Sequence, residues 1–364
     1  MKAAVCYEHG KPLVVEEVDI DPPQKGEVKV KVAASAICHS DIHVMRGEWG
    51  EMPGEPLPGV LGHETAGYVE EVGEGITSVK PGDAVMMSLL VSCGHCLYCT
   101  IGFPHLCLSG FGRESKKNIH NKQGQSITQM AKVAGYAEHT VVDECQIVKV
   151  PDGVPLDRAA LLGCGFITGF GAVVNRVQVK ALSSVVVVGT GGVGLSAVQG
   201  AALSGAYPLI AVDILDNKLE AARVFGATHT VNAKKEDAVA VVQKLTAGIG
   251  ADYVFVTGGG AAAVTQGYAM SGPRGTTVLV ALPPMKEGFS FPPPAEFIAM
   301  EKSFVGSFMG STRLHVDIPR LMNLYLAGRL KLDELITGRY PLEQINEAIE
   351  SVERGEALRN VIIF

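Results

Sequence analysis

The segment VVVVGTGGVG at residues 185–194 decides the fold of this chain, because it predicts a buried strand that turns directly into a helix. Its four valines form the strand, and a G-x-G-x-x-G pattern follows them. Gly189 permits a tight turn, Gly191 lets the backbone approach a pyrophosphate, and Gly194 allows the helix to pack closely on the strand. Since the N-terminus of a helix also offers free N–H groups to phosphates, the segment predicts a dinucleotide-binding turn.

Further strand–helix units surround this turn. Buried strands are predicted at residues 184–188, 209–212 and 253–256, with helices at 193–204 and 218–225 between them. Apolar strands that alternate with helices are typical of a parallel sheet with helices on its faces. The sequence therefore predicts an α/β domain with a doubly wound parallel sheet.

Asp213 ends the second of these strands, nineteen residues after Gly194. An acidic residue at about this distance accepts hydrogen bonds from the adenosine ribose of a bound dinucleotide. The alternative is that Asp213 caps the next helix, since Asp is a favoured N-cap residue. Lys218 is placed to contact the same sugar, and no Arg lies between the two to receive a 2′-phosphate. NAD, rather than NADP, is the predicted cofactor.

The sequence on either side of this region has a different rhythm. Residues up to about 165 show short alternating runs, such as 27–32, which are typical of half-buried strands in a β-rich domain. We therefore expect two domains, residues 1–165 completed by 307–364, and residues 166–306. The remaining predictions are two helices and a last strand at 318–328, 342–354 and 360–364, a stiff connector at 291–294, and a solvated loop at 113–125.

Composition narrows the class of protein. The 364 residues are 47% hydrophobic, which is enough to fill two cores. A net charge of −7 argues against a nucleic-acid or anionic-membrane surface. No apolar stretch reaches the length of a membrane span, and the first residues do not form a signal-peptide core. We expect a cytoplasmic protein whose eight cysteines are reduced thiols and metal ligands.

Four cysteines form a C-x2-C-x2-C-x7-C lobe, namely Cys93, Cys96, Cys99 and Cys107. Four thiolates so close in sequence can converge on one tetrahedral ion, and zinc favours such a closed, structural site. Disulfides are disfavoured in a chain that does not look secreted. An iron–sulfur cluster is the rival, but its cysteine run ends C-x3-C-Pro. The lobe predicts a structural zinc site.

A second group of possible metal ligands is dispersed. Cys38 lies among polar residues, His63 follows a glycine, and Cys164 stands where the strand–helix region begins. Spacing does not join these three residues, because each could be an ordinary buried side chain.

Taken together, the motifs resemble the zinc-dependent medium-chain alcohol dehydrogenases over essentially the whole chain. The resemblance lies in Gly-His-Glu at 62–64, the cysteine lobe, Cys-Gly-Phe-Ile-Thr-Gly at 164–169, the dinucleotide turn, and the closing segment 359–364. It implies a GroES-like catalytic domain, a Rossmann cofactor domain, and two zinc ions per chain.

The resemblance also implies roles near a catalytic zinc ion. Cys38, His63 and Cys164 would bind this ion and leave a fourth position open. Asp41 would hold the ring of His63, and Glu64 would lie behind the metal.

Substrate and cofactor contacts follow from the same resemblance. Ser40 would touch the substrate oxygen, and His43 would pass the proton to solvent. His39 and Arg359 would face the pyrophosphate. The other cofactor-binding residues implied by the turn and by the resemblance are Thr168, Gly189, Gly191, Gly192, Val193, Gly194, Asp213, Lys218, Val280 and Leu282.

The implied reaction is the NAD-dependent oxidation of an alcohol to an aldehyde, by a homodimer or homotetramer. Apolar residues at the expected pocket positions, Trp49, Leu89 and Leu282, favour a primary hydrophobic or aromatic alcohol. A glutathione-dependent formaldehyde dehydrogenase shares every motif, and a polyol dehydrogenase is a further alternative. A zinc-free reductase or a non-catalytic zinc-binding and nucleotide-binding protein fits less well, since Ser40, His43 and the thiols are all present.

Overall fold

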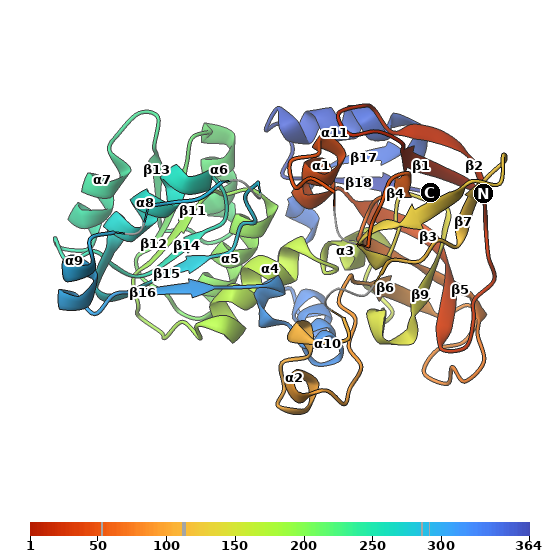
Figure 1. Cartoon of the computed structure of the whole chain (residues 1–364). Coiled ribbons are helices and arrows are strands. Elements are labelled where there is room, and N and C mark those ends of the chain that lie inside the picture. Colours follow the sequence, from red (N-terminus) through yellow and green to blue (C-terminus); the bar gives the residue numbers. More distant parts are fainter. Residues whose placement is uncertain (52–53, 111–113, 285–286, 291) are drawn as a thin grey trace. The chain divides into compact units, whose positions relative to one another are not determined.

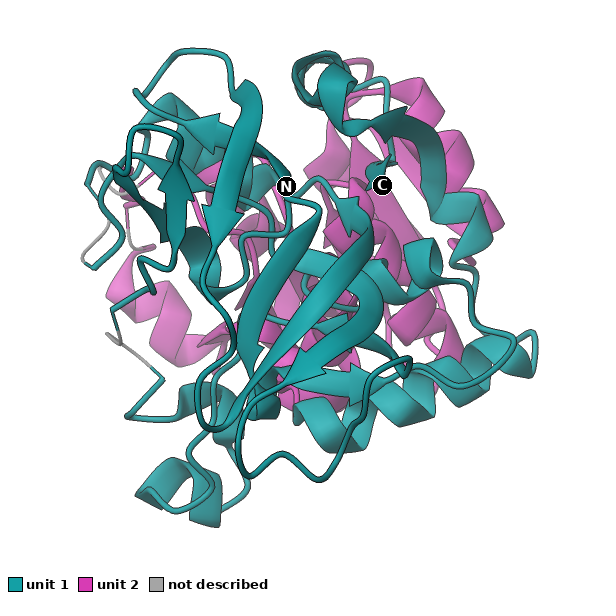
Figure 2. Cartoon of the chain, turned by 90° about the vertical axis from the view of Figure 1, so that its right-hand side faces the viewer, with its two compact units in different colours: residues 1–164, 313–364 teal, residues 165–312 magenta. Residues whose placement is uncertain are grey.

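The computed structural model divides the chain into two compact units (Figure 2). Both boundaries lie near the predicted ones, the first one residue earlier and the second six residues later. Unit 1 comprises Met1–Cys164 and Arg313–Phe364, and unit 2 comprises Gly165–Thr312. The structure describes residues 1–51, 54–110, 114–284, 287–290 and 292–364.

Unit 2 is built on a parallel sheet in which the predicted valine strand is central. Val185 pairs with Leu209 on one side and Tyr253 on the other, and the valines are buried. This arrangement confirms the predicted doubly wound sheet (Figure 1). In order across the sheet, the described strands are β13 (His229–Asn232), β12 (Leu209–Asp213), β11 (Val185–Val188), β14 (Ala251–Val256), β15 (Ser271–Leu279) and β16 (Ser303–Gly306).

The helices of unit 2 follow its strands, and α5 packs on β11 and β12. The predicted connector at 291–294 is wrong at its end, because Pro294 begins a helix, while Phe291 lies outside the described residues. The helical elements are α4 (Gly165–Gly171), the π-helix η4 (Ala172–Arg176), α5 (Gly192–Leu203), α6 (Asp216–Val224), α7 (Ala238–Leu245), α8 (Gly260–Met270), α9 (Pro294–Ala299) and the 3-10 turn η5 (Met309–Ser311).

Unit 1 is β-rich, as predicted, and contains a closed barrel and a larger sheet. The last strand of the chain, β18, pairs antiparallel with β3, and β3 pairs with β5, so the C-terminus enters the core of this unit. The barrel strands are β1 (Lys2–Cys6), β2 (Val14–Ile20), β7 (Ile119–Asn121), β8 (Ser126–Gln129) and β4 (Gly59–Val60). The sheet strands are β10 (Ile147–Lys149), β6 (Ala84–Met87), β5 (Glu64–Val72), β3 (Glu27–Ala36), β18 (Arg359–Ile363), β17 (Ile336–Pro341) and β9 (His139–Asp143).

The longest described strand of unit 1, β3, forms because apolar and polar residues alternate along it. Along β3, Val28, Val30 and Val32 point into the core, and polar residues separate them. The predicted solvated loop at 113–125 is wrong in part, because β7 lies within it and pairs with β2; Arg113 lies outside the described residues.

Helices complete unit 1, and none of those that the structure describes is long and apolar enough to cross a membrane. They are α1 (His39–Arg46), α2 (Leu97–Thr100), α3 (Leu156–Leu161), α10 (Leu314–Leu326) and α11 (Ile345–Glu353), with 3-10 turns η1 (Pro104–Leu106), η2 (Met130–Lys132), η3 (Glu144–Gln146), η6 (Asp333–Leu335) and η7 (Leu342–Gln344).

Candidate functional site

Unit 1 brings together the three dispersed residues that spacing did not connect. Cys38 is the N-cap residue of α1, His63 and Glu64 lie where β5 begins, and Cys164 follows α3. All four side chains are buried, and each offers a ligand atom within 4.8 Å of the others. We call Cys38, His63 and Cys164 the buried ligand set.

Asp41 fixes the orientation of His63. As the third residue of α1, Asp41 reaches back to the amide of Cys38, in a capping box that ties its position to the start of the helix. Its Oδ1 atom accepts hydrogen bonds from His63 Nδ1 and from the amide of Gly62, both at 3.1 Å. His63 is therefore held through Nδ1, and its Nε2 remains for a metal.

Electrostatics within the set favour a bound cation. A hydrogen bond from Cys164 and the positive charge of His63 hold the pKa of Cys38 well below its ordinary value. Burial alone would lower the pKa of His63, but Asp41 and the Cys38 thiolate raise it well above its usual range. The hydrogen bond to Cys38, together with burial, raises the pKa of Cys164. A metal ion would bind the thiolate forms of Cys38 and Cys164 and take the place of the proton on His63, so the cation would relieve these opposed pKa shifts together.

Glu64 and Arg359 form a buried ion pair beside the set. Burial raises the pKa of Glu64 to about 8, while the guanidinium of Arg359 opposes this shift. Arg359 begins β18, is only 6% exposed, and donates to Glu64 through one of its terminal nitrogens. In the structure this guanidinium points toward Glu64. The predicted contact of Arg359 with a pyrophosphate stays a prediction.

The buried ligand set fits zinc. Two thiols and one imidazole make a tetrahedral zinc site with an open fourth position, which is the arrangement of catalytic rather than structural zinc. His63 Nε2 is buried and has no hydrogen-bond partner of normal geometry among the described residues. A metal ion would satisfy this atom and the thiols together.

The predicted proton-handling residues lie on α1, next to the set. Ser40 Oγ is 3.6 Å from Cys38 Sγ. His43 follows three residues later, so the two side chains share one face of the helix. The Nδ1 atom of His43 bonds to the carboxylate of Glu48, and its ring stacks on Trp49 with centroids 5.3 Å apart. Of the other α1 residues, His39 is exposed.

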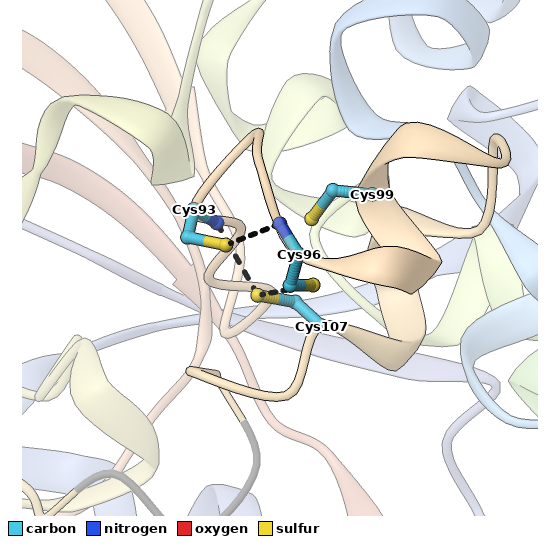
Figure 3. A group of neighbouring side chains, drawn as sticks. All are labelled: Cys93, Cys96, Cys99 and Cys107. Atoms are coloured by element: carbon cyan, nitrogen blue, oxygen red, sulfur yellow. Dashed lines mark hydrogen bonds between the residues drawn. The ribbon is translucent and has the colours of Figure 1, made fainter.

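The cysteine lobe forms the second candidate metal site, and its four sulfur atoms are turned toward one another (Figure 3). The amide of Cys96 donates to Cys93 Sγ at 3.3 Å, and the amide of Cys93 donates to Cys107 Sγ at 3.2 Å. Backbone N–H groups, including that of His95, lower the pKa of Cys93 to about 5. Burial raises the pKa of Cys99 to about 12. A zinc ion is the group that would bring all four thiols to the thiolate form.

In unit 2, the glycines of the predicted turn have distinct environments. Gly189 has a φ of +86°, which disfavours other residues. A Cβ on Gly194 would lie 1.9 Å from the carbonyl oxygen of Gly189, whereas a Cβ on Gly191 would meet nothing within 4 Å. The chain itself therefore requires glycine at 194 but not at 191, and the open space at 191 is available to a ligand. Gly192 and Val193 begin α5 beside it.

Asp213 does not cap α6, whose N-cap residue is Leu215. Instead, its Oδ2 accepts from the amide and hydroxyl of Thr190 at 2.6 and 2.9 Å. Its Oδ1 accepts from the amides of Ile214 and Leu215 at 2.7 and 3.1 Å. A carboxylate has about four acceptor positions. A ribose would therefore have to share these oxygens with the protein or displace some of its donors.

The other predicted cofactor residues of unit 2 differ in burial. Lys218 is buried on α6, and burial lowers its pKa. Thr168 is half-buried on α4 and contacts the sulfur of Met309. Val280 is buried after β15, whereas Leu282 is 58% exposed. Their contacts with a nicotinamide or a ribose stay predictions.

Two polar residues in unit 1 were not singled out from the sequence. Tyr136 donates from its hydroxyl to Asp41 Oδ2 at 2.8 Å, and Glu48 binds His43. Glu48 is five residues from His43, so a search for acids near the histidine could have found it. No pattern in the sequence marks Tyr136, which is 95 residues from Asp41.

A buried thiol–imidazole set, a cysteine lobe and a dinucleotide-type turn are the parts of a metal-binding dehydrogenase. Residues 24–152 match the family described as alcohol dehydrogenase GroES-like domain, and residues 192–327 match the family described as zinc-binding dehydrogenase. The NDMA-dependent alcohol dehydrogenase of Amycolatopsis methanolica is 38% identical, over 100% of this chain and 98% of that protein.

Solved structures of alcohol dehydrogenases are similar to this chain over its whole length. Benzyl alcohol dehydrogenase from Acinetobacter calcoaceticus has a TM-score of 0.92 at 32% identity, covering 100% of this chain and 99% of that one. An alcohol dehydrogenase zinc-binding domain protein from Burkholderia ambifaria also has a TM-score of 0.92, at 34% identity, covering 100% and 98%. The chain belongs to the zinc-dependent medium-chain alcohol dehydrogenase family, and it is an oxidoreductase that acts on alcohols.

Proposed function

We propose that this chain is an NAD-dependent zinc alcohol dehydrogenase that converts a primary, hydrophobic or aromatic alcohol into its aldehyde. The observation that carries the proposal is the buried ligand set, in which Asp41 fixes the ring of His63. Two zinc ions per chain are implied. The lobe would hold a structural ion, and the set would hold a catalytic one with an open position.

The residues of α1 would handle the proton. A zinc ion in the set would act as a Lewis acid that makes the hydroxyl of a nearby alcohol easier to deprotonate. The hydroxyl of Ser40, next to Cys38, would accept this proton while it gives up its own proton to His43. His43 would take the proton onward, because imidazole exchanges protons near neutral pH. Glu48 holds Nδ1 of His43, so Nε2 is the atom that would receive it.

The turn between β11 and α5 supports NAD as the hydride acceptor. The open space at Gly191 and the N–H groups at the start of α5 suit a pyrophosphate. Asp213 ends β12, where an acid would accept from a ribose diol and repel a 2′-phosphate. An alternative acceptor is suggested by the relative that is named as NDMA-dependent.

Apolar residues at positions expected near the substrate support the choice of alcohol. Trp49 packs partly against the core of unit 1 and stacks on His43, and Leu89 is half-buried. The similarity to a benzyl alcohol dehydrogenase points the same way. These observations favour an aromatic or aliphatic alcohol over a polyol.

A substrate panel tests the proposal. Aliphatic, allylic and benzylic alcohols, sorbitol, threonine and hydroxymethylglutathione would each be offered with NAD, with NADP, and with NDMA in the presence and absence of NAD. We expect NADH absorbance to rise fastest with benzylic or long aliphatic alcohols. A preference for sorbitol would favour a polyol dehydrogenase, and a preference for hydroxymethylglutathione would favour the formaldehyde dehydrogenase. Turnover with NDMA but not with added NAD would contradict NAD as the acceptor.

A further inference from the structure

Tyr136 is a fully buried residue of unit 1 that has no role in the proposed function. It is 0% exposed, and both of its backbone polar groups form hydrogen bonds. Its N–H donates to the carbonyl of Leu61, and its carbonyl accepts from the N–H of Ala4. The ring lies against Gly62, where a Cβ would meet Tyr136 Cδ1 at 2.6 Å. Gly62 has a φ of +91°, so both the space and the backbone require glycine there.

The hydroxyl of Tyr136 continues a chain of hydrogen bonds that ends at a metal ligand. It donates to Asp41 Oδ2 at 2.8 Å, while Asp41 Oδ1 accepts from His63 Nδ1 at 3.1 Å. The other donor to Oδ2, the amide of Cys38, is 3.4 Å away. The tyrosine is therefore the closest described partner of that oxygen, and it opposes rotation of the carboxylate away from His63.

We propose that Tyr136 is a positioning residue for His63, acting through Asp41. This inference rests on the proposed function only in that the buried ligand set holds zinc. Groups that orient a metal-binding histidine change metal affinity by about 10–100-fold when they are removed. Tyr136 acts one step further out than Asp41, so we expect an effect at the low end of this range.

The variant Tyr136→Phe isolates the hydroxyl, because the backbone contacts and the packing on Gly62 remain. The measurement is the rate at which zinc passes from the purified protein to a chromogenic chelator. Two release phases are expected, one from the lobe and one from the buried ligand set. The variant Cys164→Ser, which lacks a ligand of the set, identifies the phase that belongs to it. The lobe phase then serves as an internal control for general loss of structure.

We expect Tyr136→Phe to release the zinc of the set about tenfold faster while leaving the lobe phase unchanged. The same substitution in an Asp41→Ala background should add nothing, because the tyrosine acts through that carboxylate. Tyr268→Phe removes another buried phenol hydroxyl, in unit 2, and should change neither phase.

Two results would overturn the inference alone. One is an unchanged release rate from the set in Tyr136→Phe, and the other is an equal acceleration in the Asp41→Ala background, which would mean that the hydroxyl only packs. A native protein that holds zinc in the lobe and none in the set would overturn this inference together with the proposed function.

Discussion

Asp41 and Asp213 are carboxylates whose acceptor positions are filled by donors from their own chain. Asp41 accepts from a histidine ring, a tyrosine hydroxyl and two amides, and Asp213 accepts from a threonine and two further amides. Such a carboxylate is fixed before any ligand arrives, so less freedom is lost on binding. Asp41 would use this rigidity to hold His63, whereas Asp213 would have to share its oxygens with a ribose or release some of its own donors.

His43 gives a prediction that depends on pH. Replacement by Gln removes the group that would accept the proton from Ser40, and we expect kcat for alcohol oxidation to fall on the order of a hundredfold near neutral pH and below. The loss should shrink at higher pH, where hydroxide can take the proton directly. Profiles of kcat against pH for the native protein and His43→Gln check this. Because His43 also contacts Glu48 and Trp49, a loss of equal size at every pH would mean that it only packs.

Asp213 gives a prediction about cofactor choice. A 2′-phosphate about 4 Å from this carboxylate would meet repulsion of about 4 kcal/mol at an effective dielectric of 20. A quarter of that after screening still corresponds to roughly fivefold discrimination. We expect kcat/KM to favour NAD over NADP by at least this factor, and the gap to narrow in Asp213→Asn. Thermal unfolding of the variant controls for loosening of the turn, since Thr190 also bonds here. Equal efficiency with both cofactors in the native protein would remove the role given to Asp213.

The turn between β11 and α5 offers a matched pair of substitutions. In Gly194→Ala, the new methyl would lie 1.9 Å from the carbonyl oxygen of Gly189, so the helix must shift and stability should fall by about 1–3 kcal/mol. In Gly191→Ala, nothing lies within 4 Å of the methyl, so the free energy of unfolding should change by less than about 0.5 kcal/mol.

NAD affinity should also distinguish Gly191→Ala from Gly194→Ala. We expect Gly191→Ala to weaken NAD binding clearly, because its methyl would occupy the space that the pyrophosphate needs. Urea unfolding and calorimetric titration with NAD measure the two effects. Unchanged NAD affinity in Gly191→Ala would show that the pyrophosphate does not approach at this position.

Elements with a strong apolar period could be predicted from the sequence, and weaker ones could not. The strand 184–188 and the helix 193–204 appear as β11 and α5 with ends shifted by one residue. Both are long or apolar enough to show their period. The strand β7 was missed because three residues in a polar stretch show no period. The start of α9 was missed because Pro at the first position of a helix is compatible with either a helix or a connector.

In the candidate site, too, only features that are local in the sequence could be predicted from it. Local patterns revealed the cysteine lobe and the glycine turn, since their members are close in sequence. Cys38, His63 and Cys164 could be joined only by family resemblance, because α1, β5 and α3 bring them together through the tertiary fold. Tyr136 could not be found at all, since its role depends on how its segment pairs with residues 61–62.

At the scale of the whole molecule, unit 1 contains two candidate zinc sites with different supports. The buried ligand set lies among packed strands and helices, so its residues would stay in place without help from the metal. The lobe has exposed apolar residues, including Leu97, Ile101 and Leu108, and its four-residue helix has no buried side chain. Metal binding would supply much of the folding free energy of such a segment.

Zinc content and turnover, measured on the native protein, Cys164→Ser and Cys99→Ser, test the central claim most directly. We predict two zinc ions per native chain and NAD reduction with benzyl alcohol. Cys164→Ser should keep one zinc ion and an unchanged circular dichroism spectrum but lose turnover, whereas Cys99→Ser should lower the unfolding temperature or the solubility. One zinc ion per native chain, or an active Cys164→Ser variant, would contradict the assignment of the buried ligand set as the catalytic centre.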